Sequence, residues 1–272
     1  MDRPPVAVCG KPLDGSLMTA VEFRQVSYRA GGLAILDQFT LAVQPGETLV
    51  LLGRSGAGKT TALKMVNGLV FPTTGEIVVE GRTTTAWDLI ELRRSIGYVI
   101  QEVGLFPHLT VAENVGIVPR LKSWTAERIA ARTRELLTQV DLAPEEFAGR
   151  YPRQLSGGQR QRVGVARALA AEPRLLLFDE PFGALDPVTR LELQNQFLAL
   201  RERLHKTCIF VTHDVREALR LGTRIALLDR GRLETLATPD QFLKSLGPQT
   251  RGFLAVLDQE LRAKGEEPQS HT

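Results

Sequence analysis

The sequence predicts an α/β fold in which helices cover a mostly parallel β-sheet. First, short and nearly continuous apolar segments such as residues 48–52 and 175–178 are typical of strands buried on both faces. Second, segments with apolar residues at helical spacing alternate with these strands. Third, 272 residues with 43% hydrophobic and 24% charged side chains are ordinary for a globular chain, which excludes collagen-like, mucin-like and wholly disordered proteins.

Charge and cysteine content restrict the setting of the protein. A formal net charge of +3 is too small to indicate a nucleic-acid partner, and none is expected. Cys9 and Cys208 cannot supply a disulfide framework for so long a chain, and Cys208 lies in an apolar run where a buried thiol is expected. A reducing, intracellular setting follows. The sequence shows neither a signal-peptide pattern nor an apolar stretch of about 18 residues, so no membrane span is predicted.

The first half of the chain reads as a leader followed by strands and one helix. Residues 1–18 are rich in Pro and Gly and are expected to be flexible. Strands are expected around residues 21–26 and 36–43, and a fully buried strand at 48–52. A helix with apolar residues at Leu63, Val66 and Leu69 follows, and then come strands at 77–79 and 98–100.

The second half contains a helical insert and then returns to the alternating pattern. From about residue 102 to 171 the pattern is almost wholly helical, which predicts a helical subdomain. The remaining elements are expected as a strand at 175–178, a helix at 187–204, a strand at 208–211, a helix at 215–221 and a strand at 225–228. Residues 240–272 are expected to form a short helical extension and a polar tail, so the main domain spans 19–239.

A glycine-rich loop follows the buried strand at 48–52. Residues 53–60, GRSGAGKT, match the phosphate-loop pattern G-x-x-x-x-G-K-[ST] between a strand and a helix, a context that an ordinary glycine turn does not require. Glycines let the backbone turn its N–H groups around phosphate oxygens, and the helix N-terminus adds partial positive charge. Lys59 is expected to reach the β- and γ-phosphates, and Thr60 to bind Mg²⁺. The predicted nucleotide-binding residues are Gly53, Ser55, Gly56, Gly58, Lys59, Thr60 and Thr61.

An acidic pair closes the apolar strand at 175–178. Asp179 and Glu180 stand at the carboxyl end of this strand, where α/β folds hold their ligands. Asp179 is expected to help bind Mg²⁺, and Glu180 to act as general base toward the attacking water. A solvated strand end is the alternative, and the phosphate loop in the same chain weighs against it.

A second glycine motif, LSGGQ at residues 155–159, runs directly into a helical pattern. Ser156 and the amides of Gly157 and Gly158 are therefore expected at a helix N-terminus, a second anion site, and Gln159 completes the motif. A plain helix cap does not require both glycines and the glutamine. With these motifs in this order, the sequence resembles the ATP-binding-cassette (ABC) ATPases from about residue 21 to 239.

The resemblance implies further site residues. Tyr28, just after the first expected strand, matches the aromatic residue that stacks on adenine. Gln101 matches the glutamine that bridges Mg²⁺ to the helical subdomain, which adds it to the catalytic and metal-binding residues. Asp186 matches the inter-subunit loop, and His213 the histidine that senses the γ-phosphate and joins the catalytic residues. Taken singly, Tyr28 could equally be a packing aromatic, Gln101 a strand-end amide and His213 a helix-start residue.

The resemblance also implies an assembly. Cassettes of this family form a head-to-tail homodimer in which each ATP lies between the phosphate loop of one copy and LSGGQ of the other. Hydrolysis reopens the dimer, and the helical subdomain transmits the motion to multispan permease subunits. The expected location is therefore peripheral, on the cytoplasmic face of the inner (plasma) membrane, with a substrate-binding protein as an indirect partner.

Residues 64–69 and 93–115 are similar to one group of cassettes, the bacterial importers of osmoprotectant quaternary amines such as glycine betaine, choline or carnitine. Substrate is inferred from kinship alone, because the solute contacts other subunits. An importer of amino acids or of other small solutes remains an alternative assignment, and an exporter is a weaker one.

Soluble ABC proteins that act on DNA or ribosomes form a third class. The region between Lys59 and Arg153 shows no sustained heptad pattern, and the chain carries one cassette, so this class is disfavoured. A nucleotide kinase is disfavoured because its reaction does not require the LSGGQ motif.

Overall fold

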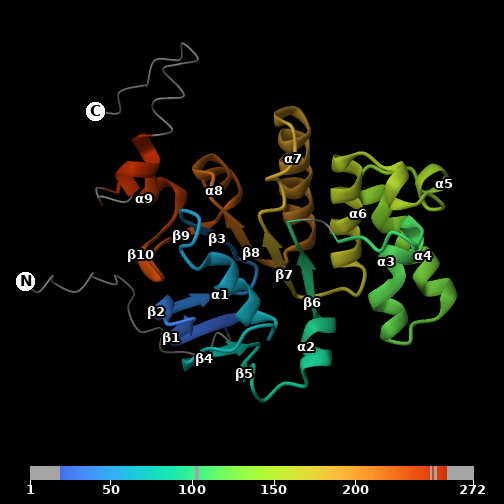
Figure 1. Ribbon diagram of the computed structural model, residues 1–272. Coiled ribbons are helices and arrows are strands. Elements are labelled where there is room, and N and C mark those ends of the chain that lie inside the picture. Colours follow the sequence, from blue (N-terminus) through green and yellow to red (C-terminus); the bar gives the residue numbers. More distant parts are fainter. Residues whose placement is uncertain (1–18, 102–103, 246, 248–249, 256–272) are drawn as a thin grey trace, which may run out of the picture.

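The computed structural model describes residues 19–101, 104–245, 247 and 250–255. The predicted leader, residues 1–18, and the part of the predicted tail after residue 255 lie outside these ranges. Two β-sheets and the helices around them make up the described chain (Figure 1). The predicted α/β class, with a mostly parallel sheet, an antiparallel part and a group of inserted helices, is confirmed.

The central sheet has the strand order β10-β9-β3-β8-β7-β6. Neighbouring strands pair in parallel except for β9 and β10, which form an antiparallel hairpin. The parallel pairs place the carboxyl ends of β3, β7 and β8 at one edge of the sheet, where the predicted motifs begin. The strands are β3 (Thr48–Leu52), β6 (Ile96–Val99), β7 (Leu175–Asp179), β8 (Thr207–Thr212), β9 (Arg224–Asp229) and β10 (Arg232–Ala237).

The second sheet is antiparallel, with the order β2-β1-β4-β5. Its strands are β1 (Val21–Ala30), β2 (Leu33–Val43), β4 (Thr74–Val79) and β5 (Arg82–Thr83). The expectation that Tyr28 follows the first strand is wrong, because β1 continues through it to Ala30. Register shifts around Val26 and Tyr28 break the apolar alternation there, while pairing with β2 carries the strand onward.

The helices are α1 (Lys59–Val66), α2 (Leu89–Ser95), α3 (Val111–Leu121), α4 (Ala126–Gln139), α5 (Pro144–Phe147), η1 (Pro152–Gln154), α6 (Gly157–Leu169), α7 (Pro187–Leu204), α8 (Val215–Leu221) and α9 (Pro239–Leu243), and residues 250–255 are also helical. The predicted bounds of α7 and α8 are confirmed. Leu69 is not part of α1, since the helix ends at Val66 and Gly68 adopts a positive φ of 64° that turns the chain; Leu69 is half exposed.

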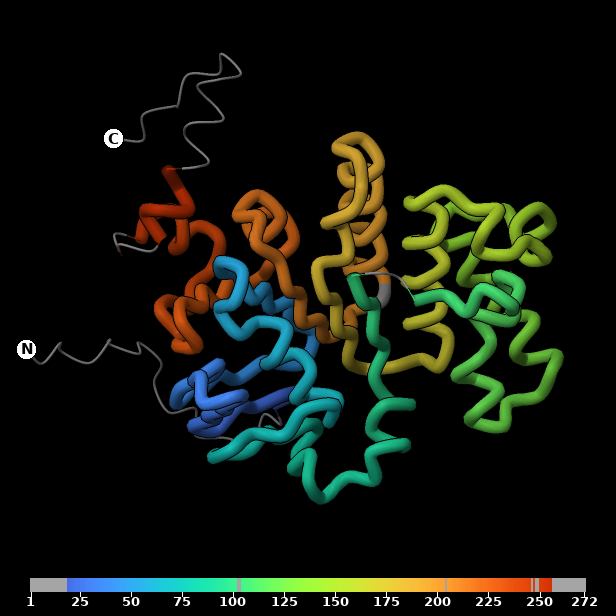
Figure 2. Tube along the Cα trace, viewed as in Figure 1, coloured from blue at the N-terminus to red at the C-terminus, as the bar shows by residue number. Residues whose placement is uncertain are grey.

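The inserted helices connect β6, at the end of the strand order, to its neighbour β7. The chain leaves the central sheet at the carboxyl end of β6 and rejoins it at the amino end of β7. The chain passes from β6 into α3, α4, α5, η1 and α6, here called the helical group, and returns in β7, which pairs with β6 (Figure 2). The described part of the chain contains no helix that is long and apolar enough to cross a bilayer.

Alternate residues of each central strand face two different hydrophobic clusters. Leu49 and Leu51 of β3 belong to the α1 cluster, which lies between the central sheet, α1 and the antiparallel sheet. Val50 and Leu52 belong to the α6 cluster, which also includes residues of α7, of α8 and of the helical group that contains α6. The predicted buried thiol is confirmed, because Cys208 lies in this second cluster as a free cysteine. The sheet is covered on both faces, as its continuous apolar strands require.

Candidate functional site

The loop of residues 53–60 connects buried β3 to α1 and depends on glycine. Gly58 is the N-cap of α1 and has a φ of 96°, a conformation that side chains rarely adopt. A Cβ atom on Gly58 would lie 2.7 Å from the carbonyl oxygen of Ile35 and 2.8 Å from Cδ2 of Leu36. The antiparallel sheet therefore packs directly against the loop. At the loop apex, Ser55 and Gly56 are exposed.

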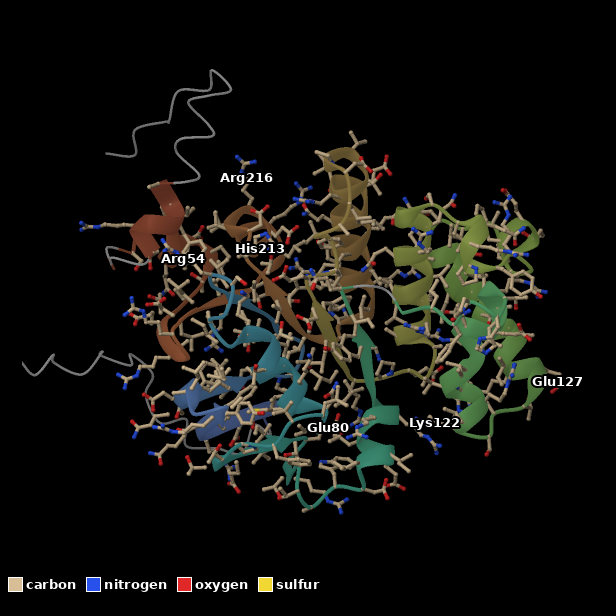
Figure 3. The ribbon with its side chains drawn as sticks, in the orientation of Figure 1. Arg54, Glu80, Lys122, Glu127, His213 and Arg216 are labelled. Atoms are coloured by element: carbon tan, nitrogen blue, oxygen red, sulfur yellow. The ribbon has the colours of Figure 1, made fainter. Side chains whose placement is uncertain are left out.

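Lys59 is buried inside this loop. Its Nζ donates hydrogen bonds to the carbonyl oxygens of Gly53, at 2.8 Å, and Arg54, at 3.0 Å. Burial lowers the pKa of Lys59, and the charges of Glu180 and Asp179 act in the opposite direction. The loop thus holds a cation beside two carboxylates. Figure 3 shows the labelled side chain of Arg54 on the α9 side of the loop.

Asp179, the last residue of β7, is buried and connects three elements. The hydroxyl of Thr60, in the first turn of α1, donates to Oδ1 of Asp179 at 2.7 Å. The hydroxyl of Tyr98, on β6, donates to Oδ2 at 3.3 Å. Burial and the nearby Asp179 charge raise the pKa of Tyr98, so its hydroxyl stays a neutral donor. The structure therefore brings together the phosphate loop and the acidic pair, which lie 119 residues apart.

Glu180 turns away from Asp179 toward β8. Its φ of 45° is left-handed, which is uncommon for a residue other than glycine, and its N–H donates to the carbonyl oxygen of Val211 at 3.0 Å. Oε2 of Glu180 lies 3.1 Å from Nδ1 of His213, an exposed side chain that Figure 3 labels next to α8. The two residues form one cluster at the carboxyl edge of the sheet.

Gln101 lies beside the same cluster. A Cβ atom built on Gly183 would lie 3.8 Å from Oε2 of Glu180 and 4.0 Å from Nε2 of Gln101. The exposed amide of Gln101 and the Glu180 carboxylate therefore flank the same glycine. The predicted residues Gln101, Glu180 and His213 are brought together by the ends of β6, β7 and β8.

Tyr28 lies on strand β1 of the antiparallel sheet, the sheet that packs against the phosphate loop. It pairs across the strands with Leu36, the residue that packs against Gly58. Tyr28 is partly buried and packs against the α1 cluster. Its placement is compatible with both interpretations of this aromatic, packing and base stacking.

The second glycine motif stands at the N-terminus of α6. Ser156 is the N-cap: its Oγ accepts from the N–H of Gln159 at 3.2 Å, and Oε1 of Gln159 accepts from the N–H of Ser156 at 2.9 Å. Ser156 and Gly157 are exposed, while Gly158 is packed so closely that a Cβ atom would lie 2.5 Å from Cγ2 of Thr189 on α7.

Asp186 caps the neighbouring helix α7. Its side chain accepts from the N–H groups of Val188 and Thr189. Hydrogen bonds from Thr189, first from its hydroxyl and then from its N–H, lower the pKa of Asp186. The LSGGQ motif and Asp186 thus form one exposed surface. Figure 1 shows α6 and α1 on opposite sides of β7 and α7, so one chain does not bring its two glycine motifs into one site.

The residues near the loop fit a hard divalent cation. Thr60 offers a hydroxyl and Asp179 a carboxylate in direct contact, and Gln101, placed beside Glu180, offers an amide oxygen. These are ligands that Mg²⁺ prefers. The described residues contain no group of three or more His, Cys, Asp or Glu side chains that could hold a metal. One carboxylate beside a phosphate loop is typical of Mg²⁺ bound together with nucleotide phosphates.

Tyr98 is the side chain of this site that sequence reasoning missed. It reaches Asp179 only because β6 is the sheet neighbour of β7, and the two residues are 81 positions apart. Pairing of distant strands leaves no signal in one sequence. The short β6 pattern alone could have indicated only a strand.

Fold and site together define a cassette of the phosphate-loop nucleotide-binding class, with a helical group inserted between two strands. The sequence matches the ABC transporter family over residues 36–183, more than half of the chain. The chain therefore belongs to the ABC transporter family, as an ATP-binding cassette.

Curated relatives and a solved structure agree with this assignment. The chain is 48% identical over 228 residues to the choline transport ATP-binding protein OpuBA of Bacillus subtilis (strain 168), which covers 84% of this chain and 59% of that protein. It is 48% identical over 219 residues to the glycine betaine uptake system ATP-binding protein YehX of Escherichia coli (strain K12), covering 80% and 71%. The dimeric structure of MJ0796, a bacterial ABC transporter cassette, matches with a TM-score of 0.72 and 36% identity, covering 80% of this chain and 98% of that chain. The chain thus spans about three fifths of the length of the choline relative.

Proposed function

We propose that this chain hydrolyses ATP with Mg²⁺ as the cassette subunit of an importer for a quaternary amine osmoprotectant, such as glycine betaine, choline or carnitine. The observation that carries the ATPase is the contact between Thr60 and Asp179, which joins the phosphate loop to the acidic pair. The solute class is supported by the relatives, which are named for choline transport and glycine betaine uptake.

In this proposal the phosphate loop binds the nucleotide. The N–H groups of the loop surround the phosphates, and the Lys59 ammonium exchanges its carbonyl partners for β- and γ-phosphate oxygens. Tyr28 stacks on adenine. The residues assigned to binding on this side are Tyr28, Gly53, Ser55, Gly56, Gly58, Lys59, Thr60 and Thr61.

The catalytic proposal assigns one role to each neighbour of the loop. Thr60, Asp179 and Gln101 would hold Mg²⁺, which when bound neutralises charge on the phosphate oxygens. Glu180 takes the proton of the attacking water at its carboxylate. His213, which lies against Glu180, is assigned to sense the γ-phosphate. Gln101, which flanks Gly183 beside Glu180, is assigned to link this cluster to the helical group.

A second copy completes the site. Ser156, Gly157, Gly158 and Gln159 form an exposed helix N-terminus, suited to a phosphate, on the other side of β7 and α7 from the loop of their own chain. We therefore propose a head-to-tail homodimer in which this motif closes on the nucleotide of the partner copy, with Asp186 between the two sites. The matched structure of the MJ0796 cassette is dimeric, which supports this arrangement.

Permease subunits are proposed to dock on a groove between the central sheet and the helical group. This groove has a volume of 360 Å³ and runs along the edge strand β6. Among its lining residues, Phe106 and Leu121 are exposed apolar side chains, and Arg93 and Arg94 add positive charge. An amphipathic permease helix with acidic residues fits this lining. Such docking places the chain peripherally on the cytoplasmic face of the membrane, with only indirect contact to a substrate-binding protein.

Transport by the intact system tests the solute class. In a host that lacks other carriers for these solutes, deletion of this gene should abolish uptake of labelled glycine betaine, choline and carnitine in high-osmolarity medium. The wild-type gene should restore uptake, and the Glu180→Gln gene should not. Normal uptake of all three after deletion, with loss of a labelled amino acid instead, would replace the osmoprotectant proposal by the amino-acid alternative.

A further inference from the structure

The carboxylate of Asp179 accepts one hydroxyl on each of its oxygens. Thr60 donates to Oδ1 at 2.7 Å, and Tyr98 donates to Oδ2 at 3.3 Å. Thr60 is itself a proposed metal ligand, so its bond belongs to the metal site. Tyr98 has no proposed ligand role, and a neutral phenol is not among the usual oxygen ligands of Mg²⁺. Its contact with Asp179 therefore needs a separate explanation.

The sheet fixes this contact. Tyr98 on β6 pairs with Leu177 on β7, and Asp179 stands two residues further along on the same face, which is also the face covered by α1. The ring of Tyr98 packs against the α1 cluster and is partly buried. The packed ring on a strand therefore restricts the rotation of the Tyr98 side chain and keeps its hydroxyl beside the Asp179 carboxylate.

We propose that Tyr98 is a positioning residue, which orients the Asp179 carboxylate for the divalent cation that accompanies the nucleotide. This inference rests on the proposed function, because it assigns a supporting role within the same site. Partners that hydrogen-bond to a metal-binding group restrict its rotation and so raise metal affinity. With the Oδ2 side held by Tyr98, the Oδ1 side of Asp179 stays turned toward Thr60 and the phosphate loop.

The removal of one hydroxyl tests the proposal. In Tyr98→Phe the ring and its packing remain, and only the donor to Asp179 is lost. Tyr151→Phe removes a hydroxyl from an exposed tyrosine and is the matched control. Asp179→Asn removes the carboxylate charge itself, and Tyr98→Phe/Asp179→Asn completes a double-mutant cycle.

The measurement is metal binding rather than turnover. Full-length protein, freed of metal with a chelator and saturated with a non-hydrolysable ATP analogue, is titrated with Mn²⁺, and free Mn²⁺ is followed by its paramagnetic resonance signal. Mg²⁺ competition then gives the Mg²⁺ affinity. Tyr98→Phe should weaken metal binding by about tenfold, the low end of the effect of such supporting partners. Analogue affinity without metal, and metal binding by Tyr151→Phe, should stay within about twofold of wild type.

The double mutant separates positioning from a structural role. If Tyr98 acts through Asp179, Tyr98→Phe has no further effect on metal binding in the Asp179→Asn background. An equal loss in both backgrounds overturns the proposal, because the hydroxyl then acts on something else. Wild-type metal affinity in Tyr98→Phe, with a clear loss in Asp179→Asn, also overturns it but leaves the proposed function standing. Metal binding that is indifferent to Asp179 would instead remove the proposed metal site.

Discussion

The carboxylate of Glu180 lies 3.1 Å from the imidazole Nδ1 of His213, although the two residues are 33 positions apart. Strands β7 and β8 are parallel neighbours, so the residues that follow them emerge at the same edge of the sheet. The left-handed φ of Glu180 turns its side chain away from Asp179 and toward β8. Two acidic neighbours in the sequence thus face different partners, Thr60 for one and His213 for the other.

Glu180→Gln should separate nucleotide binding from hydrolysis. The amide keeps the shape of the side chain but cannot accept a proton from water, so turnover should fall by about two to four orders of magnitude while MgATP binding persists. ATPase rates and nucleotide affinity of the purified variant check this. Glu234→Gln, on the exposed edge strand β10, is the control and should match wild type. Near wild-type hydrolysis by Glu180→Gln would remove the general-base role.

Tyr28→Ala should weaken nucleotide binding. Loss of a stacking contribution of roughly 1–3 kcal/mol should raise the dissociation constant by about five- to 150-fold, whereas Tyr28→Phe keeps the ring and should change it little. Fluorescent-nucleotide titration measures both variants, with thermal unfolding to confirm that β1 is intact. Unchanged affinity in folded Tyr28→Ala would leave Tyr28 as a packing residue only.

Mixed dimers should reveal a site shared between copies. Lys59→Ala removes the phosphate-loop half of each site, and Ser156→Arg blocks the exposed half on α6. In a dimer of one Lys59→Ala chain and one Ser156→Arg chain, both defects fall on the same site and the other site is intact. About half of randomly mixed dimers are of this kind, so roughly a quarter of the wild-type sites should return.

Trapped nucleotide per dimer is the measurement for this mixture, because hydrolysis can require both sites to close. Each variant alone should trap none. Mass spectrometry of tagged chains shows that mixed dimers have formed. If the mixture then traps no more nucleotide than either variant alone, the shared-site proposal fails for this protein.

The thiol of Cys208 should be unreactive in the folded protein. Burial raises its pKa to about 12, so at pH 8 the reactive thiolate is on the order of a thousandfold scarcer than for an exposed cysteine. In a Cys9→Ser variant, which leaves Cys208 as the one cysteine, an aromatic disulfide reagent should label it only after denaturant is added. Labelling in guanidinium gives the full count of one thiol, and rapid labelling without it would contradict the buried assignment.

The sequence predicted those elements whose signals are local. Helices α7 and α8 have their predicted bounds because each begins at an aspartate cap, Asp186 or Asp214, and carries its own apolar pattern. Ser156 was likewise expected at a helix start, and it caps α6. The positions of the phosphate loop and of the acidic pair followed from motif and context, while the roles of their residues stay predictions.

Features that depend on distant pairing could not be predicted. Strand β10 is formed by its pairing with β9, and its alternation of exposed and half-buried residues resembles a loop in the sequence. The contact of Tyr98 with Asp179 depends on the register in which β6 pairs with β7. That register is visible only in the folded sheet, so one sequence does not reveal it.

Helix α2 was missed for a local reason. It is short and has one buried residue, Leu92, which is too little for a periodic apolar signal.

The α6 cluster runs without interruption from strand residues such as Val50 and Phe178 to Val115 on α3 and Leu136 on α4. The helical group therefore shares its interior with the sheet and is not a separately stable module. Heat or denaturant should unfold both parts in a single cooperative transition. For the same reason, excision of the group would uncover the part of this sheet face that α7 and α8 do not cover, so a shortened chain is expected to aggregate rather than fold.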